Sequence, residues 1–251
     1  MAEPTRVLAF GAHPDDVEFY CAGTLVLLQE AGWDVGIATM TGGGGGSREH
    51  DFAETRRVRL AECRASADVL GAPYFYAGGA DMDVDFRHEL RVRAVHVFRQ
   101  FRPDVVLTLP PADYHTDHEE TSRLVRAACF YAPIPNYPEQ DLPPIDRVPN
   151  LYYTYARRDI LGRPAPVQFV VDIVRVHETK IRMLACHQSQ RDWVRAHHGH
   201  DDYLEEMRRR DATAGALAGL TAAEGFCQHL GPGYPRENVL AAALPDAVHK
   251  V

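Results

Sequence analysis

Residues 6–16 read RVLAFGAHPDD, a stretch that joins a short apolar run to a cluster of polar side chains. The run Arg6–Phe10 is too short for a helix and ends at Gly11, so it predicts a buried strand. The segment Val17–Ala31 carries apolar residues at helical spacing and stops before Gly32, which predicts a helix. A buried strand that leads through a polar turn into a helix is typical of a parallel α/β sheet.

The same alternation continues along the chain. Further strands are predicted at Val35–Met40, Asp104–Leu109, Leu151–Tyr155 and Val167–Ile173. Further helices are predicted at Thr55–Leu70, Phe86–Phe101, Val174–Cys186 and Asp202–Leu217. Apolar strands that alternate with helices predict an α/β fold, a mostly parallel sheet with helices on both faces. No internal repeat or linker is evident, so we expect residues 1–251 to form one domain.

The stretch from residue 132 to residue 150 breaks this rhythm. It holds six prolines, too many for a helix or a central strand. It is either a surface connection or a loop that borders the functional site, because long loops in compact domains often carry function. We take the loop bordering the site as our prediction.

Composition narrows the class of protein. The 251 residues include 27 basic and 35 acidic side chains, a net charge of −8, with no basic block, which argues against nucleic-acid binding. No apolar run approaches the roughly 20 residues that cross a bilayer, and the N-terminus shows no export signal. The five cysteines are dispersed without a CxxC pair, which predicts reduced thiols and a cytoplasmic protein.

Two clusters of metal-binding residue types follow predicted strands. Residues 13–16 (HPDD) come after the first strand, and residues 113–118 (DYHTDH) come after the strand DVVLTL. Imidazole and carboxylate groups suit zinc or another divalent first-row metal. Each cluster contains two such side chains three residues apart, so one helical turn can aim both at a single ion. If the two strands are neighbours, both clusters lie over the same sheet edge.

Three protein ligands with an open fourth position are the pattern of a catalytic zinc site. The open position holds a water whose pKa the ion lowers. A carboxylate that does not bind the metal, such as Asp15, can take the proton from this water. A second imidazole, His115, can stabilise a developing oxyanion, and Asp117 can fix its tautomer through a hydrogen bond.

The chain resembles the LmbE/PIG-L zinc deacetylases. HPDD after an apolar strand and the later HTDH look like the two signature motifs of that family. FGAHPDDVE at residues 10–18 resembles the branch of bacillithiol-biosynthesis deacetylases, which act on N-acetylglucosamine-type compounds. The resemblance covers nearly the whole chain. Supporting matches lie at Arg59–Gly71, Phe169–Ile173, Ser189-Gln190 and Ala223–Phe226.

The resemblance implies a Rossmann-like α/β fold and a bound Zn²⁺ ion. It places the zinc ligands at His13, Asp16 and His118. It also implies a homo-oligomer, because many members of the family are hexamers.

The resemblance assigns further roles to residues around the ion. Asp15 is the general base and then the acid that protonates the leaving amine. His115 stabilises the tetrahedral intermediate with Asp117 as its partner, and Arg59 reaches toward the substrate. One departure is Thr116, which stands where the family usually has proline in the second motif.

Gly42–Gly46 is a glycine run where relatives carry fewer glycines. Backbone N–H groups of such a loop can bind phosphate, but the Lys-Ser/Thr that a P-loop needs does not follow. Two interpretations stay open, a mobile loop over the pocket and an inert surface loop.

Two other histidine positions are candidates of lower interest. His187 follows a predicted helix, and we expect it to cap the helix end rather than approach the pocket. Residues 197–200 (HHGH) resemble a metal-binding tract. No apolar strand precedes them, so we expect an exposed loop.

These observations predict a zinc-dependent hydrolase that removes the N-acetyl group from an N-acetylglucosamine-type amino sugar or its glycoside and releases acetate. Its partner is a small molecule, not nucleic acid or a membrane. One alternative is an amidase of the same mechanism that acts on a thiol conjugate or a secondary-metabolite amide. Two more are a metal-stabilised carbohydrate-binding protein and a dinucleotide oxidoreductase, although the latter's glycine fingerprint is missing.

Overall fold

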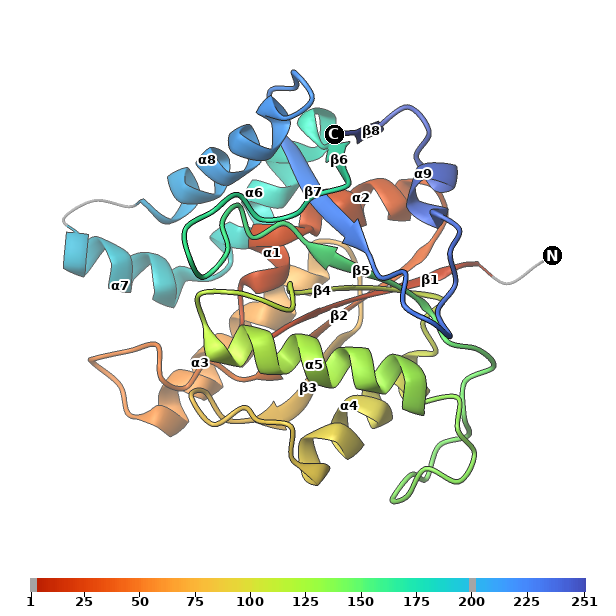
Figure 1. Cartoon of the computed structure of the whole chain (residues 1–251). Coiled ribbons are helices and arrows are strands. Elements are labelled where there is room, and N and C mark those ends of the chain that lie inside the picture. The colour runs from red at the N-terminus through yellow and green to blue at the C-terminus, as the bar shows by residue number, and fades with distance from the viewer. Residues whose placement is uncertain (1–3, 199–201) are drawn as a thin grey trace.

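The computed structural model describes residues 4–198 and 202–251 (Figure 1). The eight strands of these residues form one sheet with the order β3-β2-β1-β4-β5-β7-β6-β8. Five of them run parallel: β1 (Arg6–Gly11), β2 (Asp34–Thr41), β3 (Tyr74–Gly79), β4 (Val105–Thr108) and β5 (Asn150–Thr154). The rest pair antiparallel with their neighbours: β6 (Phe169–Asp172), β7 (Ala223–Gln228) and β8 (Val248–Lys250). The prediction of a mostly parallel sheet is confirmed.

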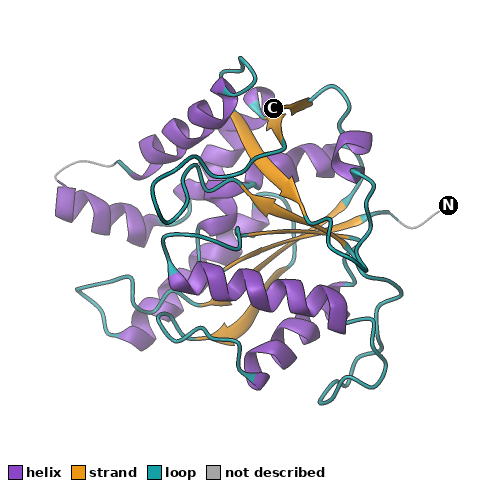
Figure 2. Cartoon of the chain, in the orientation of Figure 1, coloured by secondary structure: helices purple, strands orange, loops and turns teal. Residues whose placement is uncertain are grey.

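Helices cover both faces of the sheet (Figures 1 and 2). On β1, Val7 and Ala9 enter one apolar core and Leu8 and Phe10 the other, because successive side chains of a strand point to opposite faces. β1 is therefore buried on both sides, which explains its unbroken apolar run. The first core is covered by α2 (Ala22–Glu30), α3 (Phe52–Asp68) and α6 (His177–Ala185), and the second by α4 (His88–Phe101) and α5 (Thr116–Tyr131).

Five further helical segments complete the described part of the chain. They are α1 (Asp16–Tyr20), the 3₁₀ turn η1 (Val174–Val176), α7 (Gln188–His198), α8 (Tyr203–Ala216) and α9 (Val239–Ala243). None of the helices in the described part of the chain combines the length and the apolar character needed to span a membrane.

The strand order places a topological switch point between β1 and β4. From β1 the chain moves to β2 and β3 on one side, then returns to β4 on the other side. β1 and β4 pair in parallel, with Phe10 opposite Thr108. The loops that leave these two strands therefore lie side by side at the carboxyl edge, the usual place for a ligand in such a sheet.

Two predicted helices differ from the observed ones. The segment Val17–Ala31 contains two helices because the backbone breaks at Cys21, where φ is −151°. The segment Val174–Cys186 begins with a 3₁₀ turn before α6 starts. The other predicted elements are present within a few residues of their expected bounds.

The prediction that residues 132–150 border the functional site is wrong. α5 has 16 residues, about 24 Å, and carries the chain from the carboxyl edge back across the sheet. The segment then packs on α4, where Arg99 donates hydrogen bonds to the carbonyls of Ala132, Ile134 and Leu142. It enters β5 at Asn150, beside the first residue of β4 (Figure 1). The segment is thus a surface connection.

A buried ion network joins the C-terminal part of the chain to α2. The fully buried Lys180 ammonium lies 2.6 Å from Asp211 on α8 and 2.8 Å from Glu224 on β7. Glu224 also accepts hydrogen bonds from the backbone N–H groups of Gly23 and Thr24 at the start of α2. Four elements are therefore tied together through one lysine.

Replacing this lysine leaves two buried carboxylates without their cation. We expect Lys180→Met to lower the free energy of unfolding by about 3–5 kcal/mol, measured by urea denaturation. The matched control is Lys250→Met, which removes the chain's only other lysine from an exposed position. It should change the free energy of unfolding by less than about 0.5 kcal/mol. Equal stabilities of the two variants would contradict this expectation.

Candidate metal centre

The turn between β1 and α1 folds the Asp16 side chain back onto the backbone. Asp15 has a φ of 104°, and the turn brings the Asp16 carboxylate to the N–H groups of Ala12 and His13, each 2.8 Å from Oδ2. A Cβ at Gly11 would lie 2.8 Å from the Cβ of Asp16, so the close approach requires glycine there. The position of this carboxylate is fixed by the main chain.

The loop after β4 presents the second cluster from the start of α5. His115 is the N-cap residue of α5, and its Nδ1 accepts a hydrogen bond of 3.1 Å from the backbone N–H of Asp117. His118 follows in the first turn of the helix and is 2% exposed. The spacing HTDH therefore places both imidazoles at one helix end.

The structure brings the two clusters together. His13 Nδ1 lies 3.7 Å from Asp16 Oδ2, and His118 Nε2 lies 3.4 Å from Asp16 Oδ1. The ring centroids of His13 and His118 are 5.2 Å apart. One ligand atom from each of the three residues lies within 4.8 Å of the others, a spacing that lets them share one ion.

Each of these histidines also contacts a carboxylate through its other ring nitrogen. His13 Nε2 lies 3.1 Å from Asp117 Oδ2, and His118 Nδ1 lies 3.2 Å from Asp113 Oδ1. Carboxylates in this position fix the tautomer and orientation of metal-binding histidines. The donor set and its outer contacts fit a divalent first-row metal held by His13, Asp16 and His118.

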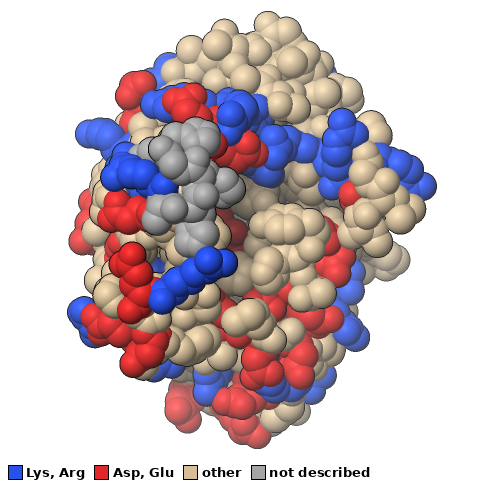
Figure 3. All heavy atoms as spheres, turned by 90° about the vertical axis from the view of Figure 1, so that its left-hand side faces the viewer, with Lys and Arg blue, Asp and Glu red and all other residues tan. Residues whose placement is uncertain are grey.

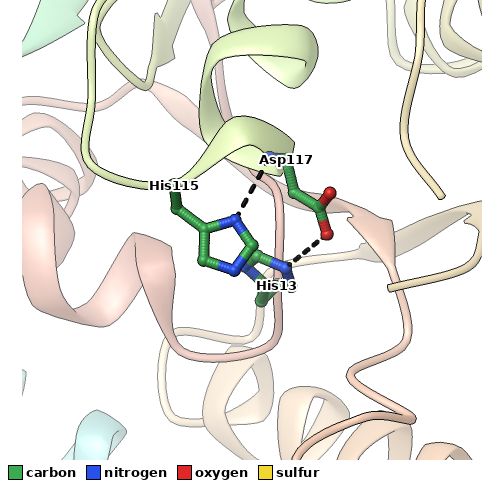
Figure 4. Close-up of side chains that lie close together, drawn as sticks. All are labelled: His13, His115 and Asp117. Carbon is green, nitrogen blue, oxygen red and sulfur yellow. Dashed lines mark hydrogen bonds and ion pairs between the residues drawn. The ribbon is translucent and has the colours of Figure 1, made fainter. Parts of the chain in front are cut away.

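The role expected for Asp117 is corrected by this geometry (Figure 4). Its carboxylate accepts hydrogen bonds from the His13 ring and, at 2.7 Å, from the backbone N–H of Met82. It is the backbone N–H of Asp117, not its side chain, that bonds His115. The tautomer of His115 is fixed all the same, with the remaining proton on Nε2.

The charges of the cluster favour a cation. Burial works against the protonated form of His118, yet Asp16 and Asp113 raise its pKa to about 9. Burial also opposes ionisation of Asp16, but His118 and His13 lower the pKa of its carboxyl group. Carboxylates therefore dominate the field in which an ion would sit.

A second group of possible ligands consists of His13, His115 and Asp117, whose donor atoms also lie within 4.8 Å of one another. In this group Asp117 Oδ2 already accepts two hydrogen bonds, and Nδ1 of His115 already accepts one. Oδ2 of Asp16 also accepts two backbone hydrogen bonds, but its Oδ1 faces His118, so we keep His13, Asp16 and His118 as the candidate ligands. Burial, with some contribution from the neighbouring His13, lowers the pKa of His115, so its ring is neutral near pH 7.

Asp15 lies beside the cluster and contacts Arg59 behind it. The Arg59 guanidinium is 4% exposed and donates to Asp15 Oδ2 at 3.1 Å, to the carbonyl of Pro14 at 2.6 Å and to that of Gly43 at 3.2 Å. Burial raises the pKa of Asp15, while the positive charge of Arg59 opposes this rise. In this structure Arg59 supports Asp15, and its contact with substrate stays a prediction.

The glycine run packs around Arg59 and is not a surface loop throughout. Gly42–Gly44 are buried, and a Cβ at Gly43, whose φ is +72°, would lie 2.6 Å from the guanidinium. The N–H groups of Gly43 and Gly45 both donate to the Asp81 carboxylate, at 2.9 and 3.0 Å. A carboxylate of the chain thus occupies the donors that a phosphate would need.

The expectation for His187 is wrong. Its side chain is fully buried and its Nε2 lies 3.3 Å from Glu18 Oε1, so it does not cap a helix at the surface. The buried Glu18 carboxylate needs such a partner, because a buried charge is costly unless it is paired. Residues 199 and 200 of the HHGH tract lie outside the described residues, and residues 197 and 198 are the last two of α7.

A cavity of about 690 Å³ opens next to the metal cluster. Asp113 and Tyr114 belong to its wall, together with Tyr155, Arg158 and Arg210. The Tyr114 side chain is 80% exposed at this mouth. Figure 3 faces this end of the molecule and shows the surface hollowed below a band of Lys and Arg side chains.

Three residues of the site had no assigned role before the structure. Asp113 precedes the HTDH motif in the cluster at residues 113–118, and its position in the same loop as His118 was the available signal. Asp81 and Tyr203 lie in segments without a motif, and only the fold brings them to the glycine run and to Asp15.

Comparison with known proteins agrees with this arrangement. The family model described as PIG-L, GlcNAc-PI de-N-acetylase, matches residues 8–129. Diacetylchitobiose deacetylase of Thermococcus kodakarensis is 31% identical over 197 residues, 74% of this chain and 70% of that protein. The 1D-myo-inositol 2-acetamido-2-deoxy-alpha-D-glucopyranoside deacetylase of Rhodococcus erythropolis is 30% identical over 243 residues, 75% of this chain and 82% of that protein.

A solved structure shares the fold. N,N'-diacetylchitobiose deacetylase from Pyrococcus horikoshii superposes with a TM-score of 0.75 over 92% of this chain and 88% of that chain, at 23% identity. With the sequence relatives, these matches establish that the chain belongs to the PIG-L (LmbE-like) deacetylase family. The narrower likeness to the bacillithiol branch stays a prediction.

The two possible ligand groups make different predictions for metal binding. We expect His118→Ala to abolish stoichiometric zinc binding, whereas His115→Ala retains one equivalent. Asp117→Asn should weaken binding by roughly 10- to 100-fold, because it loosens His13. Isothermal titration with Zn²⁺ and elemental analysis measure all three. Loss of the metal in His115→Ala together with its retention in His118→Ala would show that the second group is the ligand set.

Proposed function

We propose that this protein is a metal-dependent N-deacetylase that hydrolyses the acetamide of an N-acetylglucosamine-type amino sugar or its glycoside. The products are acetate and a free amine. The observation that carries the proposal is the approach of His13, Asp16 and His118 to one point, with Asp15 and His115 beside it. Family membership and the amino-sugar substrates named for the relatives support it.

The proposed metal is zinc, held by His13, Asp16 and His118. Two imidazoles and one carboxylate suit zinc better than magnesium or calcium, which prefer oxygen ligands. When bound, such an ion supplies Lewis acidity, which polarises a carbonyl group and lowers the pKa of water. Everything else in the reaction is assigned to side chains of this chain.

Asp15 is the proposed general base. Both of its side-chain hydrogen bonds with described residues are accepted by Oδ2, which leaves Oδ1 to take a proton. It takes the proton from the water as the water attacks the acetyl carbonyl. It then returns this proton to the amine nitrogen as the C–N bond breaks. A raised pKa suits a group that must both accept and donate within one reaction.

His115 is the proposed oxyanion donor. Its Nδ1 accepts the backbone N–H of Asp117, so Nε2 carries the proton of the neutral ring. The ring lies 4.8 Å from that of His13, centroid to centroid, on the side of the metal cluster. A donor that is already oriented stabilises the charge that develops on the carbonyl oxygen without reorganising.

The cavity beside the cluster supports a sugar substrate. Its volume of about 690 Å³ falls in the range of small-molecule sites, and its wall mixes tyrosines with arginines. Such a wall offers flat surfaces for sugar rings and donors for hydroxyl groups. The acetamide would lie at the metal cluster and the remaining substituent in the cavity.

Acetate release from N-acetylglucosamine, diacetylchitobiose and simple N-acetylglucosaminides tests the function directly. We expect turnover that a chelator abolishes and that added zinc restores. Asp15→Asn keeps the shape of the side chain but removes the base, so kcat should fall roughly 10²- to 10⁴-fold. The control is Asp85→Asn, an exposed aspartate, which should keep the wild-type rate. Chelator-resistant activity or an active Asp15→Asn variant would refute the mechanism.

A further inference from the structure

A tyrosine from the C-terminal half of the chain contacts the proposed base. Tyr203 is the first residue of α8, and its hydroxyl donates a hydrogen bond of 2.5 Å to Asp15 Oδ2. The two residues are 188 positions apart in the sequence. Tyr203 is 8% exposed, so its hydroxyl binds the carboxylate in a site shielded from water.

Tyr203 and Arg59 both donate hydrogen bonds to the same oxygen atom of Asp15. Arg59 Nη2 reaches Oδ2 at 3.1 Å and the Tyr203 hydroxyl reaches it at 2.5 Å. Oδ1 has no hydrogen-bond partner among the described residues, and the side chain keeps 15% of its surface exposed. Two donors on one oxygen stop rotation of the carboxylate and leave the other oxygen open.

The backbone at Asp15 makes such support necessary. Its φ of 104° is a conformation that residues other than glycine rarely adopt, so it costs free energy that contacts with the surrounding structure must offset. Strained residues of this kind keep their geometry only when surrounding groups over-determine it. Tyr203 and Arg59 supply that support from α8 and α3.

The position of Tyr203 is itself fixed by packing. Its ring meets Phe19 edge-on with centroids 5.0 Å apart, and it shares the buried face of α8 with Met207 and Asp211. Asp211 is bound to the buried Lys180 at 2.6 Å, which holds α8 in register. The tyrosine hydroxyl is therefore presented by a rigid element.

We propose that Tyr203 is a positioning residue for Asp15, which holds Oδ1 toward the reacting water by binding Oδ2. This inference rests on the proposed deacetylase function. It extends the catalytic apparatus to α8, which lies outside the family segment at residues 8–129. The hydroxyl acts on the chemical step and not on substrate affinity, because its bond is made to the base.

The alternative is that Asp15 merely provides a hydrogen-bond acceptor for the buried hydroxyl of Tyr203. In that case, loss of the hydroxyl affects stability and leaves turnover unchanged. A matched control exists in Tyr152, another buried tyrosine whose hydroxyl bonds Asn238 and the N–H of Val239, away from the site. Tyr203→Phe and Tyr152→Phe each delete one hydroxyl and keep the ring, so both retain the packing of the side chain.

The test compares acetate release, zinc content and thermal unfolding of wild type, Tyr203→Phe and Tyr152→Phe. We expect Tyr203→Phe to bind one zinc and keep the wild-type KM while kcat falls about 10-fold. Tyr152→Phe should keep both kinetic constants. In the Asp15→Asn background, Tyr203→Phe should cause no further loss, because the base through which it acts is gone.

The outcomes separate the two proposals. A wild-type enzyme that releases acetate, with an equal kcat for Tyr203→Phe, overturns the role of Tyr203 alone. If Tyr203→Phe lowers kcat by the same factor in the wild type and in the Asp15→Asn variant, its effect does not act through Asp15. That result also overturns the proposed role of Tyr203. A wild-type enzyme that releases acetate from no amino sugar overturns the proposed function and this inference together.

Discussion

The parallel pairing of β1 with β4 is the constraint on which the rest of the molecule depends. It places two loops that are about a hundred residues apart next to each other at the carboxyl edge of the sheet. Local interactions cannot bring His13 to His118, because the two residues are about a hundred positions apart in the sequence. Both strands are buried on two faces, so the same apolar packing that stabilises the sheet also sets the distance between the histidines.

Around this centre, most of the carboxylates orient other groups of the site and are not in the proposed ligand set. Asp117 and Asp113 each hold one histidine, while Asp81 holds the glycine run. The two oxygens of Asp16 face His13 and His118, the other two residues of the proposed ligand set. This division explains why the site contains more acidic groups than an ion needs. A ring of oriented acids keeps the imidazoles in one tautomer and favours positive charge between them.

Much of the fold could be predicted from the sequence, because β1, β2 and β4 are continuous apolar runs and the helices between them are periodic. The two motifs also indicated the metal cluster, since imidazole and carboxylate groups recur at helical spacing after two strands. What sequence patterns could not provide was side-chain direction. The side chain of Asp117 bonds His13 while its backbone N–H bonds His115, and this arrangement depends on how the loop enters α5. No local sequence pattern marks Tyr203, because its proposed role depends on a contact with Asp15, which is 188 positions away.

The carboxylate of Glu224 accepts the first N–H groups of α2 from a strand near the C-terminus. The N–H groups at a buried helix start cannot form hydrogen bonds with water instead when such an acceptor is removed. The N-terminal region that carries the HPDD motif is consequently not self-sufficient. A minimal enzyme trimmed to that region would lack the acceptor for its second helix, and any circular rearrangement of the gene must keep both ends of this bond.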